Sequence, residues 1–229
     1  MLTETQQKFW EAYQIEENRA PRAKKLLALG TFLDSLITSP PKEWYPWARS
    51  IAEQVVDNRL DFVIRRPLFE RAVFPALLAG YRAQLPGNAR WLAGLSDQLL
   101  QCPDCRENLP PGESGELGLL RAALRHDPAD RRSRLRLLDK IAERLSYSLH
   151  ELPSGVLYGM DGASPEECDE LDEELTELCE LVSHEGLENR HSELIVECRF
   201  HFRGYRDYLL HREQYGGYAD YITQHGSQR

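Results

Sequence analysis

The fold of this chain is decided by residues 89–128, which read ARWLAGLSDQLLQCPDCRENLPPGESGELGLLRAALRHDP. Apolar residues recur at helical spacing on both sides of a proline-rich loop: Leu92, Leu95 and Leu99 before it, and Leu120 and Ala123 after it. A proline follows His126-Asp127 and ends the second run, because proline has no amide hydrogen to donate within a helix. Two amphipathic helices joined by a loop predict an antiparallel helical hairpin.

The helical spacing continues through the rest of the chain, and no pair of runs reads as strands. Helices are expected to start near Thr3 and to span about 21–37, 44–64, 67–85, 88–101, 113–125, 128–150, 165–186 and 189–215. Thr3 with Gln6, and Ser164 with Glu167, have the spacing of capping boxes. Pro75 is expected to kink the helix at 67–85. Asp127 is expected to cap the helix at 128–150. The sequence predicts an all-α array or bundle of about nine helices.

These helices are expected to form one domain over residues 1–215, with sub-lobes at 1–85 and 86–215. Two consecutive glycines, Gly216 and Gly217, follow the last long helix. Glycine is conformationally permissive and weakens a helix. Residues 216–229 are therefore expected to be a frayed tail.

Residues 89–128 resemble a tetratricopeptide repeat. The helix positions of that family fall on Leu92, Leu95, Ser96 and Leu99, counted from Pro86, and on Leu120 and Ala123, counted back from Pro128. The family period is about 34 residues, whereas these two prolines are 42 apart, so the loop at 102–112 carries the excess. Glu116 and His150 depart from the pattern, since the family has small residues there. The resemblance implies a stacked helical scaffold with a concave peptide-binding face.

Charge is distributed unevenly along the chain, which has a net charge of −9. Nine acidic residues and no basic residue lie between Glu166 and Glu180, whereas residues 121–144 hold eight basic residues and four acidic ones. We expect Asp172 or Glu173 to lie near arginines of residues 121–144. Binding to nucleic acid is not expected, because it needs a net basic face.

The five cysteines are too scattered to indicate a framework of disulfides, so free thiols in the cytoplasm are expected. Cys102 and Cys105 have the spacing of half a zinc site, but no second such pair follows, and they are weak metal candidates. The chain has no HExxH, GxSxG, P-loop or GxGxxG motif, and no cofactor is expected. No apolar run approaches the roughly 20 residues that span a bilayer, and no membrane association is expected.

Two sets of residues are candidates for binding. The first surrounds the glycine-rich segment 146–163, where Tyr147, His150, Glu151 and Tyr158 are placed to line a pocket under a lid. The second is on the last long helix, where Phe200 and Arg203 lie outside the apolar stripe that faces the core. Gly204 lies near Phe200, and an aromatic residue beside a glycine invites another helix to pack there.

Three functions remain open from the sequence. The preferred one is a protein–protein interaction module or adaptor, with a basic protein as one choice of partner. The second is an enzyme that binds a small molecule under the 146–163 loop. The third is an acidic inhibitor or immunity protein that blocks a basic partner. The sequence leaves the partner, the ligand and the oligomeric state open.

Overall fold

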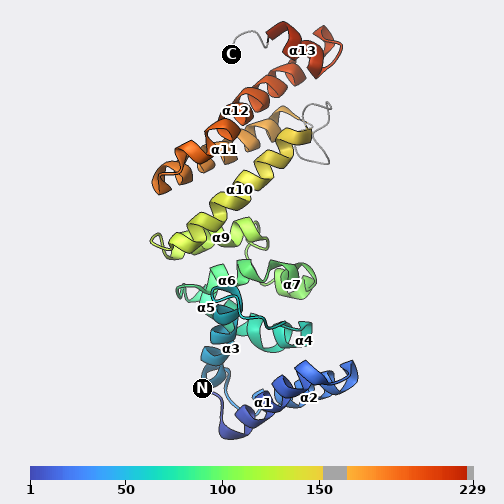
Figure 1. Cartoon of the computed structure of the whole chain (residues 1–229), viewed down its shortest axis with the longest axis vertical. Coiled ribbons are helices and arrows are strands. Elements are labelled where there is room, and N and C mark those ends of the chain that lie inside the picture. The colour runs from blue at the N-terminus through green and yellow to red at the C-terminus, as the bar shows by residue number, and fades with distance from the viewer. Residues whose placement is uncertain (152–163, 226–229) are drawn as a thin grey trace. The chain divides into compact units, whose positions relative to one another are not determined.

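The computed structural model describes residues 1–151 and 164–225, and every regular element in that part of the chain is a helix (Figure 1). The all-α class is therefore confirmed. The chain divides into two compact units, residues 1–133 and residues 134–229. No described helix is long and apolar enough to cross a membrane.

The first unit contains the helices α1 (Glu4–Arg19), α2 (Arg22–Leu36), α3 (Pro41–Val56), α4 (Arg66–Leu68), the π-helix η1 (Phe69–Val73), α5 (Phe74–Arg82), α6 (Asn88–Gly94), α7 (Ser96–Leu100), α8 (Pro103–Arg106) and α9 (Glu116–His126). Thr3 and Gln6 form the expected capping box at the start of α1. The elements expected at 67–85 and 88–101 are each divided, so the helices are shorter than the sequence indicates.

Pro75 perturbs its helix in a specific way. Proline cannot donate to the carbonyl group four residues before it, and the chain forms one π turn directly before this position. The amide of Phe74 donates to the carbonyl oxygen of Phe69, five residues back. The expected kink is therefore a π turn that joins α4 to α5.

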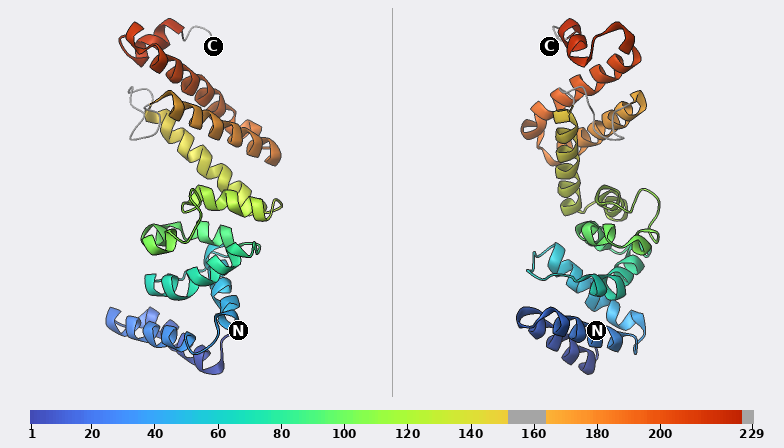
Figure 2. Two further views of the ribbon diagram at one scale, coloured as in Figure 1. Left: turned by 180° about the vertical axis from the view of Figure 1, so that it is seen from behind. Right: turned by 90° about the vertical axis from the view of Figure 1, so that its right-hand side faces the viewer.

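The core of α1–α3 is a cluster of aromatic rings. Trp10 lies at its centre, with its ring centroid 5.1 Å from that of Phe32, 4.9 Å from that of Trp47 and 5.6 Å from that of Phe62. Aromatic pairs at such separations contribute beyond their buried area. The two helices α1 and α2 lie side by side in all three views and contact each other along their length (Figures 1 and 2).

Helix α6 packs against α9, the segments on either side of the proline-rich loop. Leu92, Leu99, Leu120 and Ala123 are all buried. Helix α6 ends at Gly94, where a Cβ atom would lie 2.5 Å from the side chain of Val56, so this glycine allows close contact with α3. Membership of the repeat family stays a prediction.

A buried charge network joins the end of α3 to α6. The guanidinium of Arg90 donates to both carboxylate oxygens of Asp57, over 3.0 and 2.7 Å, and the indole N–H of Trp91 donates to Asp57 over 2.8 Å. Arg90 also pairs with Asp130, whose carboxylate accepts from the amide of Ser133. Burial alone raises the pKa of Asp57, but the hydrogen bonds from Arg90 and Trp91 outweigh it and lower that pKa.

We predict that Arg90→Ala lowers the free energy of unfolding by about 3 kcal/mol, because it removes the cation that pairs with two buried carboxylates. Asp57 would keep the largely exposed Arg132, 3.6 Å away. Urea unfolding of the full chain, followed by tryptophan fluorescence, measures this. Since the pKa of Asp57 is lowered by folding, its contribution is complete above the unfolded value of about 3.9 and is lost as the pH falls through the folded value.

Arg49→Ala is the matched control, because Arg49 lies on α3 outside this network, and its effect should stay within about 0.5 kcal/mol. Equal stability of the two variants at neutral pH would contradict a central role for the Asp57–Arg90 pair.

The second unit contains most of α10 (Arg131–Glu151), followed by α11 (Pro165–Glu185), α12 (Glu188–Leu210), the 3-10 helix η3 (Arg212–Gln214) and α13 (Tyr218–His225). The expected capping box of Ser164 and Glu167 opens α11, and Gly186 ends it in a left-handed conformation. Helices α11 and α12 lie side by side in both views of Figure 2 and make the most extensive helix–helix contact of the unit.

The cap of α10 differs from the expected one. Asp127 accepts a hydrogen bond from the amide of Ala129, within the turn that precedes the helix. Asp130 instead accepts from the amide of Ser133, over 3.2 Å, and so caps the first turn. The assignment of the cap to Asp127 is wrong by three residues, because the turn after Pro128 is not yet helical.

The end of the described chain is folded over residues 218–225, where a frayed tail is expected. Tyr218 and Tyr221 of α13 are buried, and the ring of Tyr218 lies 4.9 Å from that of Tyr205. The hydroxyl of Tyr218 donates to the carbonyl oxygen of His201, over 3.2 Å. The two glycines therefore make a turn that returns the chain to α12.

We predict that Tyr218→Ala lowers the stability of the protein by about 3 kcal/mol, as is usual for a buried aromatic side chain. Tyr218→Phe should lower it by about 1 kcal/mol, because only the hydrogen bond is lost. Thermal unfolding measures both, with the exposed Tyr147→Ala as a control. If removal of residues 216–229 left the melting temperature unchanged, α13 would not be part of the core.

Candidate functional site

The residues expected to form a pocket at 146–163 are described only in part. Tyr147, His150 and Glu151 lie in the last turns of α10, where Tyr147 is 61% exposed and His150 is exposed. Tyr158 and the glycine-rich segment 152–163 lie outside the described residues. The structure thus brings three of these four candidates to one end of α10.

Arg203, the candidate on α12, belongs to a set of ion pairs between α11 and α12. Its guanidinium lies 3.3 Å from Asp172, and Arg206 lies 2.6 Å from Asp169. These pairs are largely exposed, and water screens the attraction between their charges. Such pairs align two helices more than they stabilise them.

The acidic helix α11 also pairs with α10. Arg144 lies 3.3 Å from Glu174, and Arg134 lies 2.9 Å from Glu185 in a largely buried pair. Helix α11 does pair with arginines of residues 121–144, as expected. The acidic residues that form these pairs are Glu174 and Glu185, and not Asp172 or Glu173. Asp172, one of the two residues expected, points to α12 instead.

Part of the charge on α11 is not neutralised in this way. Glu170, Glu173 and Glu180 are exposed, and no ion pair joins them within residues 1–151 and 164–225. The whole unit 134–229 has 10 basic and 20 acidic residues, a net charge of −10, whereas residues 1–133 have a net charge of +1. The negative charge of the protein is therefore concentrated in the second unit.

An apolar hollow of about 520 Å³ lies against one face of α12. It is lined by Val196 and Phe200, with Ser192, Glu193 and Glu197 beside them. Val196 is 64% exposed, although the other face of the same helix buries Cys198, Phe202 and Tyr205. The sequence identified Phe200 but missed Val196, because a single exposed valine does not stand out from a helical pattern.

A second apolar hollow, of about 420 Å³, lies between α1 and α2. Phe9 and Leu27 line it, with Ala12 and Ala28 between them and with one acidic and one basic residue, Glu16 and Lys24. Leu27 is 73% exposed. No sequence signal marks this hollow, since these residues fit the general amphipathic pattern of α1 and α2.

Cys102 and Cys105 form a disulfide, where free thiols are expected. Their Cα atoms are 5.2 Å apart, because Cys102 is the N-cap of the short helix α8 and Cys105 lies in its only turn. Sulfur atoms bonded to each other offer a metal no thiolate. In the described part of the chain, no cluster of three or more His, Cys, Asp or Glu residues could hold a metal ion.

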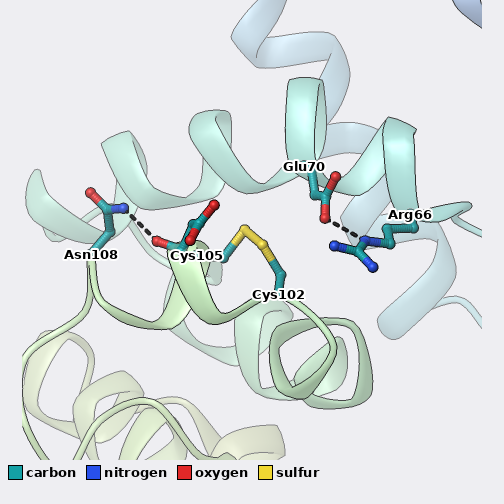
Figure 3. The surroundings of a disulfide bond; sticks show 6 residues. Arg66, Glu70, Cys102, Cys105 and Asn108 are labelled. Atoms are coloured by element: carbon teal, nitrogen blue, oxygen red, sulfur yellow. Dashed lines mark hydrogen bonds and ion pairs between the residues drawn. A yellow bond between two sulfur atoms is a disulfide. The ribbon is translucent and has the colours of Figure 1, made fainter.

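The disulfide lines a cleft of about 460 Å³ between α8 and the helix formed by α4, η1 and α5 (Figure 3). Arg66 and Glu70 lie across the cleft from the disulfide, joined to each other over 2.6 Å. Phe74, Pro75 and Leu78 supply an apolar wall. At the other end, the side-chain amide of Asn108 donates to the carbonyl oxygen of Asp104, over 2.8 Å.

The other three cysteines have no disulfide. Burial raises the pKa of the Cys168 thiol to about 11 and that of the Cys198 thiol to about 12. Buried protonated thiols are poor nucleophiles. Cys179 is half-buried, with the guanidinium of Arg199 at 3.7 Å from its sulfur.

We predict that Cys102→Ala with Cys105→Ala lowers the free energy of unfolding by only about 2 kcal/mol, because the bridge closes a very short loop. Urea unfolding of the oxidised wild type and the double variant measures the difference. If the variant failed to fold, the disulfide would be a structural requirement of the first unit.

Comparisons of the chain with protein-family models, with curated proteins and with solved structures found no match.

Proposed function

We propose that this protein is a protein–protein interaction module whose second unit binds a basic amphipathic helix of a partner. The observation that carries the proposal is the hollow on α12, where Val196 is largely exposed beside Phe200. An exposed apolar side chain beside a half-buried aromatic ring on one helix can form a site where an amphipathic helix packs.

The charge around this hollow favours a basic partner. Glu193 and Glu197 flank the two apolar residues, and the second unit has a net charge of −10. A helix with leucines on one side and lysines beside them would place its apolar side chains against Val196 and its cations against these carboxylates. The exposed Glu170, Glu173 and Glu180 would add to the attraction at long range.

The same surface supports the inhibitor as a second candidate. An acidic unit that covers a basic active site would block it, and the contacts would be the same. The two candidates differ in whether binding abolishes an activity of the partner. The enzyme alternative depends on the segment 146–163, of which residues 152–163 lie outside the described part of the chain.

The proposal includes a cytoplasmic location and no nucleic-acid partner. The three free thiols fit a reducing compartment, where a disulfide such as Cys102–Cys105 is transient or takes part in redox chemistry. Two arginines of α12, Arg203 and Arg206, are paired with carboxylates of α11, which leaves less positive charge for phosphates.

A designed 18-residue leucine–lysine helix tests the proposal. We predict saturable binding of this peptide to the full chain, measured by fluorescence anisotropy, and no binding of a leucine–glutamate helix of equal length. Val196→Asp should weaken binding about tenfold or more, because it places a charge in the apolar contact. Glu193→Lys with Glu197→Lys should weaken it through repulsion.

Leu210→Asp is the matched control, because Leu210 is a 53% exposed leucine on the same helix, outside the hollow. It should leave the affinity unchanged. If Leu27→Asp in the hollow of α1 and α2 abolished binding while Val196→Asp did not, the binding surface would be on the first unit and the proposal would be wrong.

A further inference from the structure

We propose that the Cys102–Cys105 disulfide is a thiol–disulfide exchange site for a small cysteinyl peptide. The site lies in the first unit and is independent of the hollow on α12. Such exchange has three requirements. An external thiol must reach the disulfide, and the cleft must accommodate the rest of the thiol compound. The protein must also stay folded when the disulfide is reduced.

The first requirement is access. Both cysteines line the cleft of about 460 Å³, although each is only 5% exposed overall. Because both residues line this cleft, it is the side from which a thiol would approach the bridge. The bridge lies beside the helix that carries Arg66 and Glu70 (Figure 3). Exchange depends on such access as well as on the attacking thiolate.

The second requirement is a complementary lining. Arg66, Glu70, Phe74 and Leu78 follow one another at intervals of four residues and line the same side of the cleft. The side chain of Arg66 is 63% exposed, and the side chain of Glu70 is 31% exposed. They offer a cation to a peptide carboxylate and an anion to a peptide ammonium group. Asp104 adds a second carboxylate to the lining. The cleft thus has the volume, and charges of both signs, for a short zwitterionic peptide, with Phe74 and Leu78 against its apolar part.

The third requirement concerns the bridge itself. The two cysteines are separated by three positions in the sequence, so their bond restrains little of the unfolded chain. Both sulfurs also lie in a single turn at α8, where the amide of Cys105 donates to the carbonyl oxygen of Cys102 over 3.1 Å. That hydrogen bond does not need the disulfide, so the turn can hold two thiols after reduction.

The reaction balances with the peptide thiol as the reductant. The peptide thiolate attacks one sulfur of the bridge, the sulfur–sulfur bond breaks, and a mixed disulfide forms while the other cysteine leaves as a thiolate and takes up a proton. A second peptide thiolate then attacks the peptide sulfur of the mixed disulfide. The products are the oxidised peptide dimer and the protein dithiol, so two electrons pass from two thiols to the bridge.

Glutathione, a cysteinyl tripeptide, is the probe for the test. The experiment uses the full chain with Cys179→Ser, which removes the half-buried thiol as a competing site. We expect reduced glutathione to open the bridge in the folded protein, detected by alkylation and mass spectrometry. With oxidised glutathione, Cys102→Ser or Cys105→Ser should form a mixed disulfide at the remaining cysteine, and the double variant should form none.

Arg66→Gln tests the lining. It should slow the reaction with glutathione about three- to tenfold, because the attraction of the carboxylates is lost. It should slow the reaction with 2-mercaptoethanol less, because that reagent has no charge besides its thiolate. Arg49→Gln removes the same charge from α3 and should change neither rate. Equal slowing with both thiols, or no slowing with either, would overturn the role of the lining. A bridge that glutathione opens only after unfolding in urea would overturn the exchange site.

Discussion

The carboxylate of Asp57 is the point on which the first unit depends. It lies at the end of α3 and accepts hydrogen bonds from Arg90 and Trp91 on α6, two consecutive residues with different donors. Because Arg90 also reaches Asp130, one cation fixes three segments that are distant in the sequence. A buried charge without its partner is costly, and this requirement sets where α6 can lie.

The position of α6 has consequences for the cleft at the disulfide. Helix α6 contacts α3, α5 and α9, and the chain leaves it through α7 to reach the turn that holds Cys102 and Cys105. The opposite wall belongs to the helix whose π turn is formed at Pro75. Since π turns are often found at functional sites, the combination of a proline, a π turn and a disulfide on one cleft favours a chemical role for it.

The second unit is organised by charge in a different way. Its acidic helix uses some carboxylates to align α10 and α12 and leaves others exposed. Leucines at 171, 175 and 178 bury the remaining face of α11. Helix α11 thus has a buried apolar face, carboxylates in ion pairs with α10 and α12, and further carboxylates exposed to solvent. The first two hold the unit together, and the exposed carboxylates are the ones that the proposed basic partner would meet.

The sequence predicted those features of the fold that depend only on residues close together in the chain. The two capping boxes and the apolar spacing of α2, α9 and α11 need no knowledge of the rest of the fold. It did not predict the disulfide, because a Cys-x-x-Cys pair can be a metal site, a dithiol or a bridge, and the spacing is the same for all three. The sequence indicated a frayed tail at residues 216–229, because two consecutive glycines are typical of a helix end. Nothing in the local pattern shows that Tyr218 and Tyr221 pack against α12. Val196 was missed because its exposure depends on which neighbours α12 has.

The most direct test of the proposed interaction surface is a map of backbone and methyl NMR shifts of the full chain as the leucine–lysine helix is added. The account predicts that the largest changes fall on α12, at Val196 and its neighbours Glu193 and Glu197, and that they saturate with the peptide. Changes concentrated on Phe9 and Leu27, or spread evenly over the acidic surface without saturation, would contradict it.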